Sequence, residues 1–245
     1  MNKLLSFEFR NAFKLLYVKL LPLIFLLFGI LCGILNGNNG DGSMDGLPSI
    51  CAALFEIVTV IGGMVMSKDF TQNTIRNKII VGHSRTKIYL AKQILLTVIY
   101  LLNTVFLYAG YVITTKLTVT EDPTELYAPV FNKTGFLKAS LIIFCSVLSL
   151  SLVAAFLTMS VKAALGGILP VLALYTNLFI CTLADIFYNA KLLGWITDAL
   201  PFGRMMMMTC SEPYAHTLRC CILMLCVGAA SFAGGIMIFR KTNLN

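Results

Sequence analysis

Long apolar runs, interrupted by short polar segments, dominate this 245-residue sequence. Several runs reach 18 residues or more, the length that crosses a hydrocarbon core of about 30 Å as an α-helix. We therefore predict six membrane-spanning helices, over Leu20–Leu35, Leu47–Met66, Tyr89–Thr115, Phe136–Ser160, Ala163–Ala184 and Thr217–Phe239.

The composition strengthens this prediction. Hydrophobic residues make up 58% of the chain and charged residues only 12%, whereas a soluble domain has about a quarter of its residues charged. We expect an all-α polytopic membrane protein that forms a single transmembrane domain over residues 1–245.

The lysines and arginines set an orientation. Most of the 19 basic residues fall on one side if the N-terminus lies in the cytoplasm, and most of the acidic residues then fall outside. This assignment predicts a plasma-membrane protein with both termini in the cytoplasm. Residues 67–88 become the one substantial cytoplasmic loop, whose basic residues suit anionic membrane lipids.

The first 19 residues have the pattern of an amphipathic helix at the membrane surface. Leu5, Phe9 and Phe13 recur at helical spacing, with Lys3 and Arg10 on the polar side. We expect Pro22 to bend the chain between this helix and the first span.

The cytoplasmic loop has the residues that begin and end a helix. Asp69 followed by Gln72 has the spacing of a capping box, and Gly82 stands where a glycine ends a helix. We predict a short helix over Phe70–Val81, with Ser84 as N-cap of the third span.

Together these features resemble the permease subunit of a bacterial ABC-2 type transporter. The resemblance rests on the amphipathic elbow, the six spans, a basic helix between spans 2 and 3, and the stretch "DFTQNTIRNKIIVGHSRTKIYLAKQ". It implies that the loop helix is a coupling helix, which docks onto an ATPase subunit. The expected docking residues are Asp69, Thr71, Gln72, Ile75, Arg76, Lys78 and Ile79.

The resemblance also implies partners. The chain has no G-x-x-x-x-G-K-[ST] sequence, so ATP and Mg²⁺ would bind to two copies of a separate ABC ATPase. We expect no cofactor and no catalytic or metal site on this chain, and no nucleic-acid partner. A second permease, identical or paralogous, would complete the pathway. Permeases of this family that protect their host against antimicrobial peptides are of similar size.

Glu56 is the one acidic residue predicted deep in a span. An ionisable group there is a functional candidate by default, although a protonated carboxyl bonded to a neighbouring helix would be structural. Asn103 and Asn177 are predicted at comparable depth, and we group the three as a candidate substrate pathway. The apolar surroundings favour export of a lipophilic or amphipathic substrate, such as an antimicrobial peptide or a drug-like compound. The alternative is a proton- or ion-coupled secondary transporter or channel that uses Glu56.

Residues 185–216 form a connection too long for a turn and too apolar for a solvated loop. They predict a re-entrant or interfacial segment between spans 5 and 6, with Trp195 at the headgroup level. Met205–Met208 suggests a copper site by its thioethers. Four consecutive residues of a helix point in different directions, however, so hydrophobic packing is the favoured reading.

Overall fold

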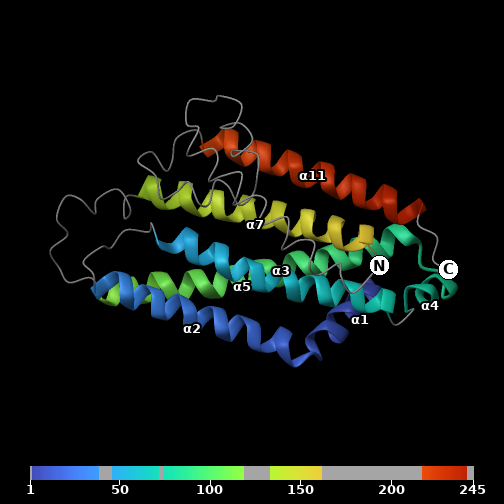
Figure 1. Ribbon diagram of the computed structural model, residues 1–245, viewed down its shortest axis with the longest axis horizontal. Helices are drawn as coiled ribbons and strands as arrows, with labels where there is room; N and C mark the ends of the chain where they lie inside the picture. Colours follow the sequence, from blue (N-terminus) through green and yellow to red (C-terminus); the bar gives the residue numbers. More distant parts are fainter. Residues whose placement is uncertain (1, 39–45, 72–73, 119–132, 162–216, 242–245) are drawn as a thin grey trace.

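The structure is a computed structural model that describes residues 2–38, 46–71, 74–118, 133–161 and 217–241 (Figure 1). All regular secondary structure within these ranges is helical, which confirms the all-α class. The helices are α1 (Asn2–Phe13), α2 (Leu16–Asn38), α3 (Gly46–Thr71), α4 (Thr74–Ile80), α5 (Arg85–Thr118), α7 (Lys133–Val161) and α11 (Thr217–Lys241).

Four of these helices are long and apolar enough to cross a membrane, with spans at Leu16–Ile34, Arg85–Thr114, Ser140–Ser160 and Thr217–Lys241. They coincide with the predicted first, third, fourth and sixth spans. The helix α3 covers the predicted second span but is not one of the four. The predicted fifth span, the segment 185–216 and Met205–Met208 lie outside the part of the chain that the structure describes.

A helix forms over Asn2–Phe13, within the first 19 residues, but the chain does not turn where we predicted. The break between α1 and α2 lies at Lys14 and Leu15, where the Leu15 amide donates to the Ala12 carbonyl at 3.1 Å, an i to i−3 bond. Pro22 lies inside α2, so the predicted bend at Pro22 is wrong in position. Proline removes one backbone donor, and helices in lipid tolerate this where neighbouring groups compensate.

Contacts along α5 establish the directions of the helices. The side chains of Gln93 and Tyr108 bond Ser151 and Ser140 of α7, so α7 runs antiparallel to α5. The Arg85 guanidinium donates to the Arg240 carbonyl at 2.9 Å, so α11 also ends where α5 begins. It follows that α7 and α11 run parallel to each other, as Figure 1 shows.

The helices α2 and α5 approach until their backbones are in contact. Gly29 and Gly33 form a G-x-x-x-G pattern on α2, opposite Gly110 on α5. A Cβ on Gly110 would lie 2.6 Å from the Leu26 carbonyl oxygen, closer than real Cβ atoms come. Small residues at such positions let membrane helices pack by close van der Waals contact.

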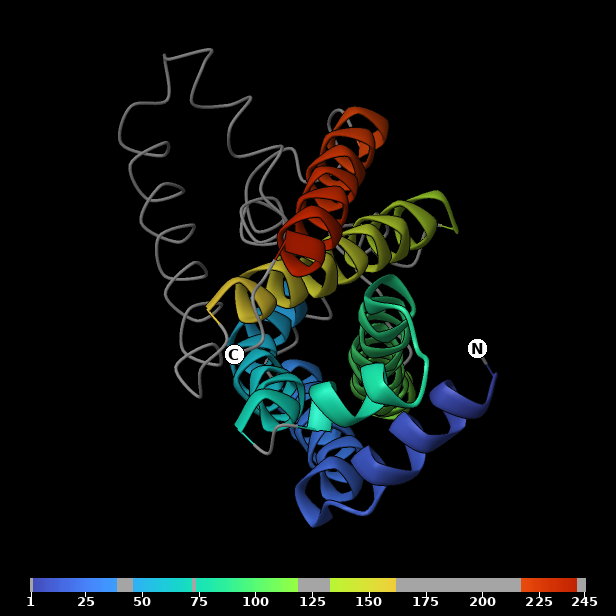
Figure 2. The ribbon, with the colours of Figure 1, turned by 90° about the vertical axis from the view of Figure 1, so that its right-hand side faces the viewer.

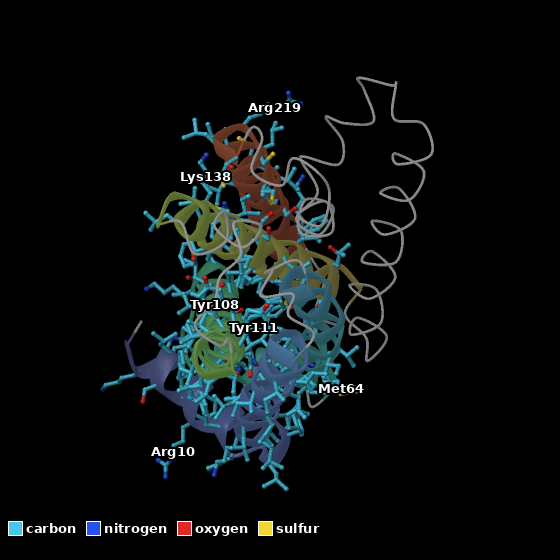
Figure 3. All side chains as sticks on the ribbon, turned by 90° about the vertical axis from the view of Figure 1, so that its left-hand side faces the viewer. Arg10, Met64, Tyr108, Tyr111, Lys138 and Arg219 are labelled. Atoms are coloured by element: carbon cyan, nitrogen blue, oxygen red, sulfur yellow. The ribbon has the colours of Figure 1, made fainter. Side chains whose placement is uncertain are left out.

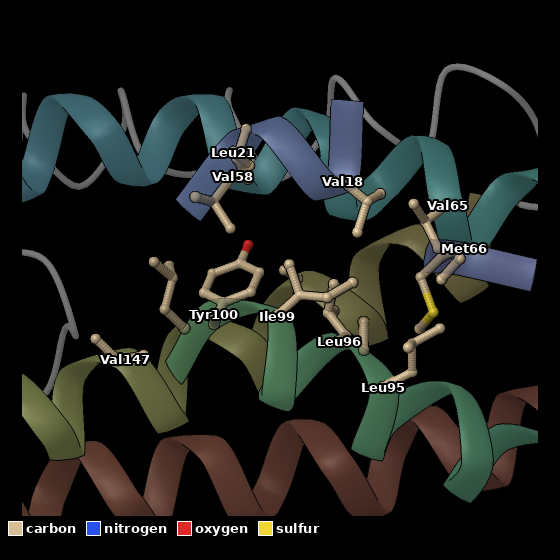
Figure 4. Packing of buried hydrophobic residues seen from close by; sticks show 14 of the residues in the cluster. Val18, Leu21, Val58, Val65, Met66, Leu95, Leu96, Ile99, Tyr100 and Val147 are labelled. Atoms are coloured by element: carbon tan, nitrogen blue, oxygen red, sulfur yellow. The ribbon is translucent and has the colours of Figure 1, made fainter. Parts of the chain in front are cut away.

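The centre of the bundle is built on α5. Tyr100 is fully buried and lies among Val58 of α3, Leu21 of α2 and Val147 of α7 (Figure 4). Tyr108 and Tyr111 lie further along the interior, whereas Arg10 and Lys138 project from the periphery (Figure 3).

Small residues of α7 form a packing surface. The Ser149 hydroxyl of α7 donates to the Met224 carbonyl of α11 at 2.7 Å. On the side towards α5, the Ser151 and Thr97 hydroxyls lie 3.1 Å apart. These contacts place α7 against both α5 and α11, as close helix packing through small residues predicts.

A buried four-charge junction beneath an exposed helix

Two short helices lie across one end of the bundle (Figure 2). They are α1 and α4, and the last turn of α3 and the first turns of α5 meet them there. Each of these four elements contributes one charged side chain to a single buried cluster: Glu8 from α1, Asp69 from α3, Lys78 from α4 and Lys92 from α5. We name this cluster the four-charge junction.

In the junction each lysine pairs with both carboxylates. The Lys78 ammonium pairs with Glu8 Oε1 and with Asp69 Oδ2. The Lys92 ammonium lies 2.9 Å from Glu8 Oε2 and 2.9 Å from Asp69 Oδ2. All four side chains are at most 12% exposed. The two positive and two negative charges cancel within the cluster. Ionised groups tolerate burial when they are paired in this way.

The junction holds α4 against the rest of the chain. Burial alone would raise the pKa of Asp69, but Lys92 and Lys78 outweigh burial and hold that pKa below its ordinary value. Removing one member of a buried ion pair leaves an uncompensated charge, at a cost of about 3–5 kcal/mol. The Lys78 ammonium also lies 5.7 Å from the centre of the Phe7 ring on α1.

Backbone and hydroxyl bonds fix both ends of α4. At its start, the Thr74 hydroxyl donates to Asp69 Oδ1 at 2.7 Å. At its end, Gly82 has a φ of 95°. The amides of Gly82 and His83 bond the carbonyls of Ile79 and Lys78. This pair of bonds is a Schellman motif and confirms the predicted role of Gly82.

The start of α4 differs from the start that we predicted for the loop helix. Asp69 does not cap a helix over Phe70–Val81, because α3 continues through it to Thr71 and α4 begins at Thr74. The physical reason is the pairing of Asp69 with two lysines, which occupies the carboxylate. Ser84 behaves as predicted, since its hydroxyl accepts the Lys87 amide at 3.4 Å before α5.

The predicted docking residues divide between two environments. Ile75 is buried and Ile79 half-buried, so they attach α4 to the bundle. Lys78, expected beside Arg76 as a surface contact, is instead buried in the junction. Arg76 is exposed. The Thr71 side chain and Gln72 lie outside the described residues.

The outer face of α4 presents apolar and basic groups side by side. We define this face as Arg76, Asn77 and Ile80 of α4 together with Val81, which directly follows the helix. Ile80 and Val81 are 75% and 76% exposed. A groove lined by Lys3, Leu4 and Phe7 of α1 runs beside it. An exposed apolar pair next to a cation suits contact with another protein or with a membrane surface.

The residues predicted deep in the membrane are only partly described. Glu56 belongs to α3, but its side chain, like the whole of Asn177, lies outside the described residues. Asn103 is buried in α5, and its amide donates to the Ile99 carbonyl at 2.7 Å. Its Oδ1 atom has no hydrogen-bond partner among the residues that the structure describes. Whether the three residues lie together therefore stays a prediction.

The sequence did not lead us to Glu8 and Lys92 as members of a site. A signal for Glu8 was present, because Leu4, Glu8 and Ala12 recur at i, i+4 and i+8 on the buried face of α1. An acidic residue on the apolar face of an amphipathic helix requires a buried cation. No such periodic signal distinguishes Lys92 from its neighbours.

Within the described ranges, no group of three or more His, Cys, Asp or Glu side chains is arranged to hold a metal ion. Compared with models of known protein families and with curated proteins, the sequence matches none.

Proposed function

We propose that this chain is the membrane-spanning permease subunit of an ATP-driven ABC-2 type exporter, and that α4 is its coupling helix. The observation that supports this most is the construction of α4. It is fixed to α1, α3 and α5 by the four-charge junction, while its outer face is exposed. A helix built in this way transmits a force applied from outside to the helices behind it.

The partner in this proposal is a separate ABC ATPase, which binds ATP and Mg²⁺. Arg76 pairs with an acidic group on that subunit, and Ile80 and Val81 fill an apolar notch. Lys78 has a different role from the one its sequence position suggests, because it anchors the helix rather than contacting the partner. ATP-dependent movement of the ATPase pair then shifts the permease between inward-open and closed states.

Six spans follow from the same proposal. The parallel directions of α7 and α11 support them, because one further crossing is needed to join the end of α7 to the start of α11. Ala163–Ala184 is apolar and long enough to make that crossing. α3 makes the second crossing, from the opposite end of the bundle back to the junction.

In this topology the α1/α4 end faces the cytoplasm. The exposed basic side chains of α1 and α4, including Lys3, Arg10 and Arg76, support that orientation. The membrane is the plasma membrane of a bacterium, and a second permease copy or a paralogue completes the pathway. The cargo is a lipophilic or amphipathic compound, with antimicrobial peptides as the first class to examine.

Co-purification in gentle detergent from native cells tests the proposal. An ATPase subunit should accompany the wild-type chain and should be lost from Arg76→Glu combined with Ile80→Asp. Lys138→Glu is the matched control, since Lys138 is exposed near the start of α7, at the opposite end of the bundle. Wild-type chain that purifies alone and transports in liposomes without ATP would contradict the proposal, and would favour secondary transport through Glu56.

A further inference from the structure

Three cysteines and a methionine lie together near the starts of α7 and α11. Cys145 of α7 and Cys220, Cys221 and Met224 of α11 form, with Ile142, a buried cluster separate from the main core. This end of α11 is opposite to the end that meets the start of α5, where the four-charge junction lies. The junction and α4 therefore leave the sulfur cluster without a role.

Two of the thiols are in contact across the interface between α7 and α11. The Cys145 and Cys221 thiols are within hydrogen-bond reach of each other, and both are reduced in the structure. Cys220 is the next residue on α11, but successive side chains of an α-helix point about 100° apart. Cys220 and Cys221 therefore do not present their sulfur atoms to Cys145 in the same way, and Cys221 is the one placed to pair with it.

The backbones of α7 and α11 approach closely beside this thiol pair. A disulfide needs Cα atoms about 4.4–6.8 Å apart, so it forms only between close backbones. One turn beyond Cys145 and Cys221, the Ser149 hydroxyl donates to the Met224 carbonyl at 2.7 Å. A Cβ on Gly228 would lie 3.2 Å from the Ser149 Cα. The packing around the pair therefore suits a bond between the two helices.

The pair lies near the end of both spans rather than at their centre. At 1.5 Å per residue, Cys221 is about 6 Å from the start of α11 and Cys145 about 7.5 Å from the start of its span. Lys138 and Arg219 mark the same end of the bundle in Figure 3. The two cysteines are 6% and 5% exposed, which suits access by a small neutral oxidant and excludes a bulky one.

We propose that hydrogen peroxide oxidises Cys145 and Cys221 to a disulfide that joins α7 to α11. One thiol takes an oxygen atom from peroxide to become a sulfenic acid, and the first water leaves. The other thiol attacks that sulfur, the S–S bond forms and a second water leaves. Peroxide gains the two electrons that the thiols lose.

The disulfide is a reversible latch between two helices. It closes the stretch of chain between Cys145 and Cys221 and restricts movement of α7 against α11, while the junction at the other end stays unchanged. A thiol reductant opens it by thiol–disulfide exchange. In the proposed topology this end faces the outside, where disulfides persist, but the pairing depends neither on that orientation nor on the proposed transport function.

Peptide mass spectrometry of the purified full chain tests this assignment. The reduced protein in detergent is treated with hydrogen peroxide, its remaining thiols are alkylated under denaturing conditions, and it is digested without reduction. We expect a linked pair of peptides joined through Cys145 and Cys221, which dithiothreitol separates. The link should form in the wild type and in Cys220→Ala, and should be absent from Cys221→Ala.

The variant Cys220→Ala is the matched control, because it removes the adjacent buried thiol and leaves the proposed pair intact. Fragment spectra of the wild-type peptides distinguish Cys220 from Cys221, so the assignment stands even if a variant does not fold. Oxidation should also raise the unfolding temperature of the wild type, because the closed loop constrains the unfolded chain. A link from Cys145 mainly to Cys220, two cysteines that both remain thiols, or an unfolding temperature unchanged by the link would overturn the proposal.

Discussion

Lys78 and Glu8 form a buried ion pair although 70 positions separate them in the sequence. The pair joins a seven-residue helix to the amphipathic helix at the start of the chain. Because Lys92 and Asp69 complete the same cluster, a movement of α4 cannot leave α1 unaffected.

Breaking the junction on one side should destabilise the protein strongly. Glu8→Gln leaves two buried lysines to share Asp69, and we expect a loss of about 3–5 kcal/mol in the free energy of unfolding. Thermal unfolding in detergent measures it. Combining Glu8→Gln with Lys92→Met leaves the balanced pair of Lys78 and Asp69, so the double variant should be more stable than Glu8→Gln alone. A double variant whose loss equals the sum of the two single losses would show that the four charges do not act together.

Charge reversal should separate the roles of two neighbouring basic residues. Lys78→Glu places a third carboxylate among Glu8 and Asp69, and we expect it to prevent stable folding. Arg76→Glu changes an exposed position, so its stability should stay within about 0.5 kcal/mol of the wild type. Partner binding should nevertheless be lost in Arg76→Glu. Equal thermal stability of the two variants would contradict the burial of Lys78.

Acid should weaken the junction through Asp69. Its pKa is lower in the folded protein than the ordinary value of 3.8, so the folded state binds fewer protons than the unfolded state as the pH falls below that value. The stability that Asp69 contributes is therefore fully present above its ordinary pKa and is lost as the pH falls through the folded pKa. Unfolding midpoints measured from pH 6 down to pH 3 should fall less steeply in Asp69→Asn than in the wild type.

The contact between α2 and α5 should not tolerate a larger side chain in place of a glycine. Gly29→Leu places a side chain against the backbone of Leu107, and we expect a loss of about 1–3 kcal/mol. Ala230→Leu adds a similar volume at an exposed position of α11 and should be nearly neutral. Equal thermal stability of the two variants would show that the close approach of α2 and α5 is incorrect.

The substitution Gly82→Ala tests the backbone conformation that ends α4. A Cβ there would meet no atom within 4 Å, so packing does not oppose Gly82→Ala. Its φ of 95° does oppose it, at a cost of about 1–2 kcal/mol. An unchanged melting temperature would mean that α4 does not end in a Schellman motif.

Local patterns in the sequence predicted the elements that depend on neighbouring residues. The third span, the end of α4 at Gly82 and the cap at Ser84 all follow from periodicity and from residues with restricted conformations. The turn between α1 and α2 was misplaced because we expected Pro22 to end the helix, whereas α2 continues through it.

The four-charge junction could not be predicted from local sequence patterns. Glu8, Asp69, Lys78 and Lys92 come from four elements, and their pairing depends on how α1 and α4 lie across the bundle. Asp69 has good local reasons to cap a helix, and only the two lysines brought to it by the fold explain why it does not. The backbone contact at Gly29 and Gly110 likewise depends on α2 and α5 being neighbours.

The most direct test of the proposed function is site-specific photo-cross-linking in native membranes, with the cross-linking residue at Ile80 on the outer face of α4. The account predicts a cross-link to a nucleotide-binding ATPase subunit from Ile80, and none from Lys138 near the start of α7. Cross-links from Ile80 to lipid alone, in cells where the chain is active, would contradict the assignment of α4 as a coupling helix.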